Sequence, residues 1–261
     1  MIKLSIITIN YNNATGLRKT IESVVNQNPQ EFEYIIIDGG STDKSVTVLN
    51  ECSHLVNHWI SEKDQGVYDA MNKGISIAKG EYLMFLNSGD ILSDKTVLDY
   101  CINHILKHPE VAIFYGDIYG IDDTIPTPWI HKHPAALDLM FLKTNNINHQ
   151  SSLIKASLFE KYGVYPTEYK LAADHWLYLK CLVNNETFFY IDYPLIIYNY
   201  EGASAKQRDK YVKEMEEMWN KEVPNHLQKL CDEIIDFNRY KSMRLVKSAI
   251  KIHQLYNKFR S

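Results

Sequence analysis

The first 120 residues alternate between short apolar runs and segments in which apolar positions recur every three or four residues. The short runs have the length and composition of buried strands, and they cover residues 4–9, 34–37, 55–60, 82–86 and 111–119. The helical spacing covers residues 14–26, 45–52, 67–78 and 94–106. Strands that alternate with helices favour a mostly parallel sheet with right-handed crossovers, so the pattern predicts an α/β fold.

This alternation stops near residue 120. Pro126, Pro128 and Pro134 argue against a regular strand or helix in the 120s and 130s. Beyond them we predict helices at 155–162 and 173–183, strands at 188–191 and 195–198, and helices from 205 to the end with a break at Pro224. The pattern therefore predicts an α/β domain over 1–204, divided at 118, and a C-terminal helical extension over 205–261.

Composition places the chain among ordinary globular proteins, with 45% hydrophobic residues and four scattered cysteines that form no CxxC pair. No apolar stretch approaches the roughly 18–20 residues that cross a bilayer, and the first residues are typical of a strand rather than a signal peptide. These features predict a cytoplasmic protein with reduced thiols. The ten histidines show no paired spacing, so no zinc site is expected.

Charge is unevenly distributed along the chain. Residues 237–261 carry seven basic side chains and no acidic one, whereas the first 236 residues carry 21 basic and 32 acidic side chains. The acidic body argues against nucleic-acid binding. Apolar residues recur at helical spacing through the basic tail, which leaves two interpretations open: a helix packed on the domain or on a second subunit of a homodimer, or a helix lying on an anionic membrane.

Polar clusters follow four of the predicted strands, at residues 8–11, 38–43, 61–74 and 87–90. Ligands of open α/β sheets bind at the carboxyl ends of the strands, so we expect the clusters to line one cleft. Asp90 follows Gly89 in the last cluster, and an exposed carboxylate there can hold a hard divalent cation. Taken alone, this cluster is more typical of an ordinary strand-to-helix turn with Asp90 as a solvated turn residue.

Together these segments resemble the family 2 glycosyltransferases, which have the GT-A fold. The resemblance rests on SIITINYN, IIIDGGSTDKS, SEKDQGVYDAMNKGI and GEYLMFLNSGD, and it covers residues 1–118 strongly and 145–200 more weakly. It implies a doubly wound, mostly parallel sheet with a Rossmann-like nucleotide-binding half at 1–118, an acceptor-binding half at 119–204, and C-terminal helices.

The resemblance also implies a set of nucleotide contacts. Thr8 and Tyr11 would line the base pocket, Asp38 would accept a hydrogen bond from uracil or a ribose hydroxyl, and Asp64 would add a contact to the base. For Asn72 and Lys73, a structural role within the helix is equally open. The full implied set is Thr8, Asn10, Tyr11, Asp38, Asp64, Asn72, Lys73, Asn87, Ser88 and Gly89.

Metal and catalytic residues are implied in the same way. The family usually has two or three acids where this chain has Asn87-Ser88-Gly89-Asp90, so Asp90 would hold Mg²⁺ or Mn²⁺ together with the diphosphate. Asp174 would be the general base, with a plain helix cap as its alternative. Contacts to the diphosphate or acceptor are implied for His149, Gln150, His175 and Trp176.

The sequence leaves three functions open. The first is an inverting, metal-dependent hexosyltransferase that moves a sugar from a UDP-sugar to a glycan or lipid-linked acceptor in surface polysaccharide synthesis, in the cytoplasm or peripherally on the inner face of the cell membrane. The second is a sugar nucleotidyltransferase, which typically needs a Gly-rich basic loop that residues 10–13 lack. The third is a non-catalytic sugar-nucleotide-binding protein, which the presence of Asp38, Asp90 and Asp174 disfavours.

Overall fold

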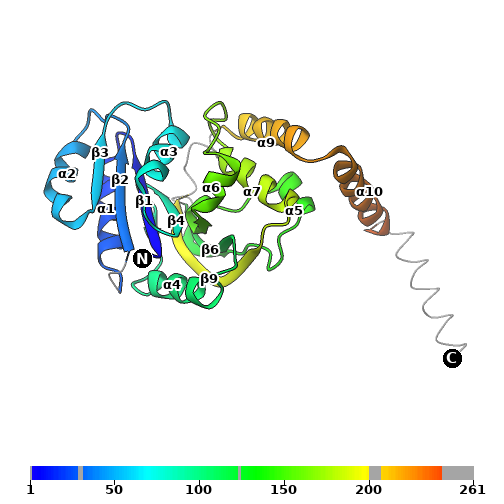
Figure 1. Cartoon of the computed structure of the whole chain (residues 1–261), viewed down its shortest axis with the longest axis horizontal. Coiled ribbons are helices and arrows are strands. Elements are labelled where there is room, and N and C mark those ends of the chain that lie inside the picture. The colour runs from blue at the N-terminus through cyan, green and yellow to red at the C-terminus, as the bar shows by residue number, and fades with distance from the viewer. Residues whose placement is uncertain (1, 29–31, 123–124, 200–206, 243–261) are drawn as a thin grey trace, which may run out of the picture.

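The computed structural model of the chain describes residues 2–28, 32–122, 125–199 and 207–242. Its first half alternates strands and helices in the order β1 (Leu4–Asn10), α1 (Ala14–Val25), β2 (Phe32–Asp38), α2 (Ser45–Cys52), β3 (His58–Ser61), α3 (Val67–Ile77) and β4 (Tyr82–Asn87) (Figure 1). Strands β1 to β4 are parallel in the sheet. The α/β fold predicted from the alternation is therefore confirmed.

The second half adds the remaining strands and helices. They are β5 (Ile91–Leu92), α4 (Val97–Lys107), β6 (Ile113–Asp122), β7 (Ile125–His131), α5 (Leu139–Thr144), β8 (Ser152–Lys155), α6 (Ser157–Tyr162), α7 (Ala173–Val183), β9 (Phe188–Asn199), α9 (Arg208–Glu222) and α10 (Asn225–Ser242). The sheet has nine strands in the order β3-β2-β1-β4-β8-β6-β9-β5, and β7 pairs with β6. It is mixed, because β8 runs antiparallel to β4 and β6.

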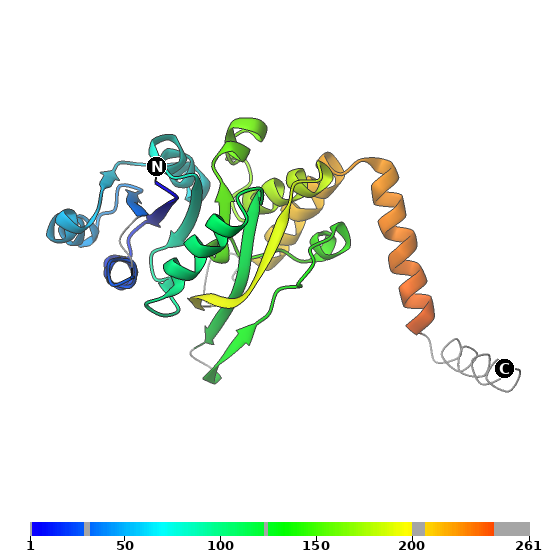
Figure 2. The same cartoon turned by 60° about the horizontal axis from the view of Figure 1, so that its bottom comes forward.

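Three predictions for the second half were wrong in detail. The prolines of the 120s do not prevent a strand, because among the described residues β7 pairs with β6 alone and lies at an edge of the sheet, where a missing N–H is tolerated (Figure 2). Residues 152–155 form β8, so the helix predicted from 155 begins at Ser157. The two strands predicted at 188–191 and 195–198 are one strand, β9, with a register shift opposite Asp117.

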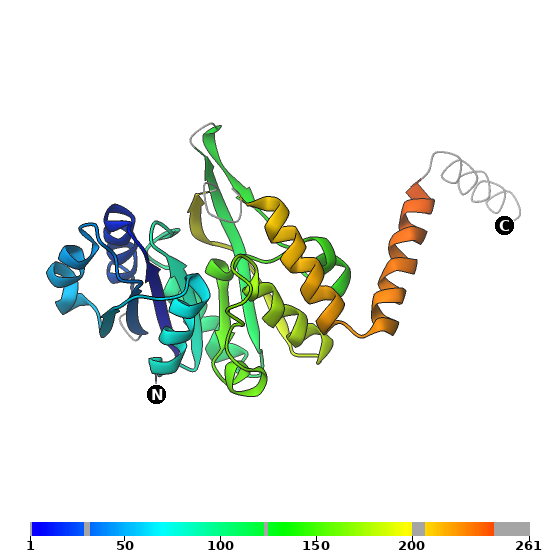
Figure 3. The same cartoon turned by 90° about the horizontal axis from the view of Figure 1, so that it is seen from above.

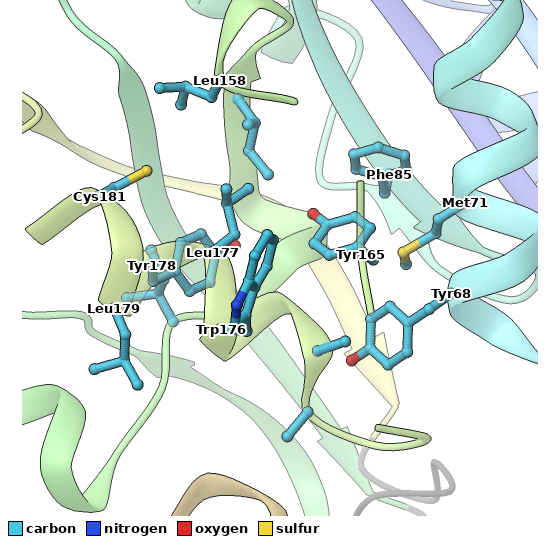
Figure 4. Close-up of a cluster of buried hydrophobic side chains, with 14 of the residues drawn as sticks. Tyr68, Met71, Phe85, Leu158, Tyr165, Trp176, Leu177, Tyr178, Leu179 and Cys181 are labelled. Atoms are coloured by element: carbon cyan, nitrogen blue, oxygen red, sulfur yellow. The ribbon is translucent and has the colours of Figure 1, made fainter. Parts of the chain in front are cut away.

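Each face of the sheet carries its own hydrophobic core, because both faces of the parallel strands are covered by helices. Along β1, Ile7 and Ile9 point into a core with α3, α5, α6 and α7, whereas Leu4 and Ile6 point into a core with α1, α2 and α4. The first of these cores fills the space between α3 and α7 with aromatic side chains (Figure 4).

Helix α9 belongs to this body. Met215, Met218 and Trp219 are buried in the same core as α7, which places α9 with the domain rather than with the extension drawn from residue 205. Helix α10 leads away from the body (Figure 1, Figure 3). Within the described residues no helix is both long and apolar enough to span a membrane. The basic segment from 243 to 261 lies outside the described residues.

Candidate active site

The polar clusters predicted to converge do so at the carboxyl ends of β1, β2 and β4. Asn10 is paired with Asp38 in the parallel register of β1 and β2, and Ile9 is paired with Asn87 in that of β1 and β4. The last residues of three strands thus lie side by side. A small pocket beside them is lined by residues of both halves of the domain, namely Gln65, Gly66, Val67, Tyr68, Asp69, Thr167, Tyr169 and Lys170.

Asp38 organises the loop after β2. Its Oδ1 accepts hydrogen bonds from Asn10 Nδ2 (2.6 Å) and Ser41 Oγ (2.5 Å), and its Oδ2 accepts them from Ser61 Oγ (2.6 Å) and the Ser41 amide (3.0 Å). Burial acts to raise the pKa of this carboxyl, but the bonds from Ser41, Ser61 and Asn10 outweigh it and hold the pKa below its usual value. Asp38 is fully buried and already has four donors, so its direct contact with a nucleotide stays a prediction.

The two residues predicted to line the base pocket differ in exposure. The Thr8 side chain is fully buried and its hydroxyl pairs with that of Tyr34 (3.1 Å), so the predicted place of Thr8 in a base pocket stays a prediction. Tyr11 leaves 66% of its surface exposed, just beyond the end of β1. An aromatic ring exposed to this degree is free to stack on a base, as predicted for Tyr11.

Asn72 and Lys73 both contact other parts of the protein in this structure. Both amide atoms of Asn72 bond to the Tyr165 backbone, with Nδ2 donating to its carbonyl (2.8 Å) and Oδ1 accepting from its amide (3.0 Å). Lys73 Nζ lies 2.9 Å from Glu62 Oε1 and donates to the Lys63 carbonyl. These contacts support the structural alternative for both residues, and their predicted nucleotide contacts stay predictions.

Asp64 packs close to the loop after β2. Its Oδ1 accepts the Gly66 amide at 2.9 Å, and a Cβ added at Gly39 would lie 2.3 Å from its Oδ2. Burial raises the pKa of Asp64, and the nearby carboxylates of Asp69 and Asp38 add to this effect. A glycine at 39 is thus required for Asp64 to approach the strand ends.

The turn after β4 is built from its own backbone. Gly89 has a φ of +112°, its amide donates to Thr20 Oγ1 (2.9 Å), and Ser88 Oγ donates to the Ile9 carbonyl (3.1 Å). Asp90 Oδ2 accepts the Asn87 amide at 2.8 Å, which folds the carboxylate back over the turn. The backbone amides of Asn87 and Gly89 and the side chain of Ser88 thus shape the turn, and the predicted nucleotide contacts of these three residues remain predictions.

Asp90 was predicted as an exposed carboxylate, and this was wrong. Only 6% of its surface is exposed, and burial raises its pKa to about 6. The Asn87 amide, the charge of His149 and a hydrogen bond with Gln150 act in the opposite direction. Gln150 is itself buried, so its implied contact lies with Asp90 in this structure.

Asp174 lies in the first turn of α7 and is 5% exposed. Its Oδ1 accepts the Tyr68 hydroxyl at 2.9 Å, and its Oδ2 lies 3.3 Å from both His149 Nδ1 and Asn146 Nδ2. Burial alone would raise the pKa of Asp174, but the hydrogen bond and charge of His149 and the bond from Tyr68 together lower it. The cluster therefore favours an ionised carboxylate.

His149 connects the two acidic residues. Its Nδ1 faces Asp174, it acts electrostatically on Asp90, and its buried Nε2 has no hydrogen-bond partner among the described residues. Nδ1 is placed to donate a hydrogen bond to Asp174, which leaves Nε2 as the ring atom without a partner. In the charged ring that lowers the pKa of both carboxyls, Nε2 is a donor that suits a phosphate oxygen, and in the neutral ring it is a lone pair that suits a cation. The two carboxylates lie 84 residues apart in sequence.

His175 touches the edge of this cluster and Trp176 lies in the core behind it, and their predicted acceptor contacts stay predictions. His175 Nδ1 lies 3.4 Å from Asn146 Oδ1, and its buried Nε2 has no hydrogen-bond partner among the described residues. His175 is fully buried, and burial lowers its pKa to about 4. Trp176 packs in the core, where its Nε1 donates to Glu222 Oε1 at 3.2 Å (Figure 4).

Asp90 and His149 are the candidate donors for a divalent cation. The described residues contain no group of three or more His, Cys, Asp or Glu placed to hold a metal. Asp90 offers one carboxylate and His149 one nitrogen. This set fits Mg²⁺ or Mn²⁺ that keeps waters and shares phosphate oxygens, which is how Mg²⁺ is usually bound.

Tyr68 and Asn146 were not among the predicted site residues, although both contact Asp174. Tyr68 belongs to one of the segments that carry the family resemblance, but its partner is 106 residues away in sequence. Asn146 lies three residues before His149. Only the fold brings either side chain to the carboxylate.

Comparisons with known proteins agree on one family. The family model described as glycosyl transferase family 2 matches residues 5–164. An uncharacterized glycosyltransferase of Mycobacterium tuberculosis is 34% identical over 179 residues, 68% of each chain. A Mycobacterium bovis protein named as a PGL/p-HBAD biosynthesis glycosyltransferase is 32% identical over 186 residues, 69% of this chain and 70% of its own.

Solved structures show the same fold at lower identity. Staphylococcus aureus TarS 1–349 superposes with a TM-score of 0.64 at 18% identity, covering 83% of this chain and 71% of TarS. The mannosyltransferase PcManGT of Pyrobaculum calidifontis, in complex with GDP-Man and Mn²⁺, superposes with a TM-score of 0.65 at 13% identity, covering 84% and 63% of the two chains. The GT-A fold predicted from the sequence is thereby confirmed.

Proposed function

The chain belongs to glycosyl transferase family 2, and we propose that it is an inverting enzyme that moves a sugar from a UDP-sugar to a hydroxyl of a glycan or lipid-linked acceptor. One observation carries the proposal. Asp174 is an ionised, buried carboxylate that lies beside His149, and His149 also acts electrostatically on Asp90. This cluster lies next to the carboxyl ends of the parallel strands. A general base and a group for the diphosphate are thus held in one cluster.

On the donor side, Tyr11 stacks on the base and the loop ordered by Asp38 surrounds the ribose. His149 Nε2 and Asp90 face the diphosphate. A bound Mg²⁺ or Mn²⁺, held by Asp90 and His149, would neutralise charge on the departing phosphate. The requirement for this metal is part of the proposal.

On the acceptor side, Asp174 takes the proton of the attacking hydroxyl as its oxygen bonds to the anomeric carbon. The bond from that carbon to the nucleoside diphosphate breaks in the same step, so the anomeric centre inverts. Tyr68 and Asn146 hold the carboxylate in place and keep it ionised. One base is sufficient for a single displacement, whereas retention would need a second positioned nucleophile.

The choice of donor and acceptor is supported by relatives. TarS 1–349 has been solved in complex with UDP-GlcNAc, and the Mycobacterium bovis relative is named for PGL/p-HBAD biosynthesis. A UDP-hexose or UDP-HexNAc donor and an acceptor carried on a lipid follow as the proposal for this chain.

A donor panel tests the function directly. The purified chain with Mn²⁺ should release UDP from one UDP-sugar faster than it releases GDP or dTDP from the corresponding sugars. Chelation by EDTA should remove this activity, and added Mn²⁺ or Mg²⁺ should restore it. Release of nucleotide is measured by a coupled assay.

A matched control is the same panel with the Asp174→Asn variant. Equal release by wild type and variant would identify a contaminating hydrolase. Binding of UDP by calorimetry without release from any donor would favour the non-catalytic function, and synthesis of a UDP-sugar from UTP and a sugar phosphate would favour the nucleotidyltransferase.

The basic tail is proposed to bring the enzyme to a lipid-linked acceptor. Helix α10 leads to the tail, and Leu230, Ile235 and Phe237 are exposed along it. Lysine to glutamine changes at Lys247, Lys251 and Lys258 should weaken binding to vesicles with anionic lipid, because each basic residue near such a surface contributes about 1 kcal/mol. Co-sedimentation at rising salt measures the effect, which is screened over about 8 Å at physiological salt.

The matched control changes three exposed lysines of the body, Lys19, Lys95 and Lys107, in the same way. Their removal should leave vesicle binding unchanged. If both triple variants bind equally, or if the tail variant instead changes oligomeric state in light scattering, the tail contacts a subunit and not a membrane.

A further inference from the structure

The helix that carries the proposed base has no cap of its own. Helix α7 begins after Ala172, whose side chain has no oxygen to accept the first N–H groups of the helix. The amides of Lys170, Leu171 and Ala172, just ahead of the helix, instead donate to one carboxylate from a distant helix. That carboxylate is Glu214 of α9, at 3.0, 2.8 and 3.1 Å.

Glu214 is placed to act on α7 strongly. It is 7% exposed, and its three donors are all backbone amides, so neither water nor another side chain is needed to satisfy it. A negative charge at the start of a helix is stabilised by the helix dipole. The carboxylate therefore fixes the backbone two residues before Asp174.

A second path leads from α9 to the same site. The Tyr211 hydroxyl is hydrogen-bonded to Asn146, and Asn146 Nδ2 lies 3.3 Å from Asp174 Oδ2. Helix α9 therefore contacts both the backbone that carries Asp174 and a side chain that contacts its carboxylate. This helix lies beyond residues 5–164, which the family model matches.

The far end of the same helix pair supplies a natural comparison. Glu222 of α9 accepts the Trp176 Nε1 at 3.2 Å and lies 2.6 Å from Lys180 Nζ. Its side chain is 7% exposed, so Glu222 also joins α9 to α7 from a buried position. Its partners on α7 follow Asp174 in the sequence, and Glu222 contacts their side chains, not the backbone at the start of the helix.

We propose that Glu214 is a positioning residue for catalysis, which sets the place of Asp174 through the backbone of residues 170–172. The proposal rests on the proposed role of Asp174 as the general base. When the three amides are released, the start of α7 shifts and the carboxylate moves relative to the acceptor hydroxyl. Displacement of a catalytic group by about 1 Å can reduce a rate by about 10²-fold.

The test compares Glu214→Gln with Glu222→Gln. An amide at 214 keeps the shape of the side chain but turns an N–H₂ toward backbone amides, so it cannot satisfy all three. We expect kcat to fall by about 10- to 10²-fold in Glu214→Gln, with UDP affinity by calorimetry unchanged. Glu222→Gln should keep kcat within about twofold while both variants lower the Tm, because each loses a buried contact between the same helices.

Hydrogen exchange of the peptide covering residues 168–176 supplies a readout that does not depend on turnover. Exchange should be slow in wild type and in Glu222→Gln, and faster in Glu214→Gln. If Glu214→Gln does not fold, Glu214→Asp is the second variant, because it keeps the charge and moves it away by one methylene. Its kcat should be lower than that of wild type and of Glu222→Gln, and higher than that of Glu214→Ala.

Three results would overturn the proposal. One is a normal kcat in Glu214→Gln at a temperature well below its Tm, which would make Glu214 purely structural. Another is an equal loss of kcat in both variants, and the third is unchanged exchange at 168–176. Absence of turnover in wild type would instead count against the proposed function, and the exchange measurement would still decide whether Glu214 holds the start of α7.

Discussion

Replacement of Asp174 by asparagine should lower kcat by at least about 10²-fold, because general-base catalysis typically contributes 10²- to 10⁴-fold. The amide keeps the size of the side chain and can still accept the Tyr68 hydroxyl, so the cluster should persist. UDP affinity should change little, since Asp174 lies on α7 and the proposed nucleotide contacts of Tyr11 and Asp38 lie at the ends of β1 and β2. Steady-state kinetics with the donor identified in the panel, together with UDP calorimetry, measures both quantities.

The control is Asp99→Asn. Asp99 also lies in the first turn of an 11-residue helix, α4, whose core is on the opposite face of the sheet. If Asp174 acted only as a charge near a helix start, both variants would lose the same few tenths of a kcal/mol and keep their activity. Loss of UDP affinity with chemistry intact would assign Asp174 to nucleotide binding.

The lowered pKa of Asp174 fixes the sign of its pH dependence. Its carboxyl binds a proton less readily in the folded state than at its ordinary value of 3.8, so its contribution to stability is present above that value. The contribution is lost as the pH falls through the lower folded pKa. Across neutral and mildly acidic pH the base therefore stays ionised, and Asp174 should not limit activity there.

Replacement of Asp90 by asparagine should have two large and opposite effects. Metal-dependent transfer should be abolished, because the amide loses the charge that the cation needs. The metal-free protein should become more stable by about 3 kcal/mol at neutral pH, since a carboxyl raised from 3.8 to about 6 carries a burial cost of about 1.4 kcal/mol per pKa unit. Thermal denaturation and the transfer assay give the two results.

The pH dependence of Asp90 has the opposite sign to that of Asp174. The folded state binds the proton more tightly, so the cost of burying the charge grows as the pH rises from 3.8 to about 6 and is complete above it. The stability gained by Asp90→Asn should thus be largest above about pH 6 and vanish near pH 4. Because a proton and the cation compete for this carboxylate, the Mn²⁺ concentration that gives half-maximal activity should rise as the pH falls below about 6.

Glu33→Gln is the matched control for Asp90→Asn, because Glu33 is also a buried carboxylate. It lies near the start of β2, at the opposite edge of the sheet from the site. It accepts the Ser5 hydroxyl and the Lys79 amide, so its replacement should lower stability and leave the response to Mn²⁺ intact. Transfer at a normal rate by Asp90→Asn would contradict the role of Asp90 as the metal ligand.

The sequence allowed the fold and the edge of the sheet that carries the site to be predicted, because both depend on local patterns. The alternation of short apolar runs with helical spacing is a property of neighbouring residues, and so is the polar residue at each strand end. The meeting of Asn10 and Asp38 follows from parallel pairing of adjacent strands. The predicted convergence needed no other information.

The orientation of single side chains needed the tertiary structure. In a parallel strand covered on both faces, period two does not distinguish Thr8 from its neighbours, and the partner of Thr8 is a tyrosine on the next strand. Asn72 is a polar residue on a helix, and the backbone that satisfies it lies 93 residues later. The burial of Asp90 depends on His149 and Gln150, which lie far along the chain and pack over the turn that carries Asp90.

The charged residues of helix α9 likewise cannot be told apart from the sequence. Its sequence, RDKYVKEMEEMWNKE, has the composition of a solvated polar helix, with several glutamates of similar surroundings in sequence. Only the packing separates Glu214, which accepts three backbone amides, from Glu217, which pairs loosely with Lys213 at the surface. Distances in space decide which of the glutamates matters for Asp174.

The two prolines of β7 have a consequence for solubility. A strand at the border of a sheet exposes unpaired backbone groups, and these can recruit a strand from another molecule and begin aggregation. Pro126 and Pro128 lack the N–H that such a strand would require, and they stand in the border strand that pairs with β6. The same residues that obscured this strand in the sequence therefore protect the folded protein from growing a sheet with another copy.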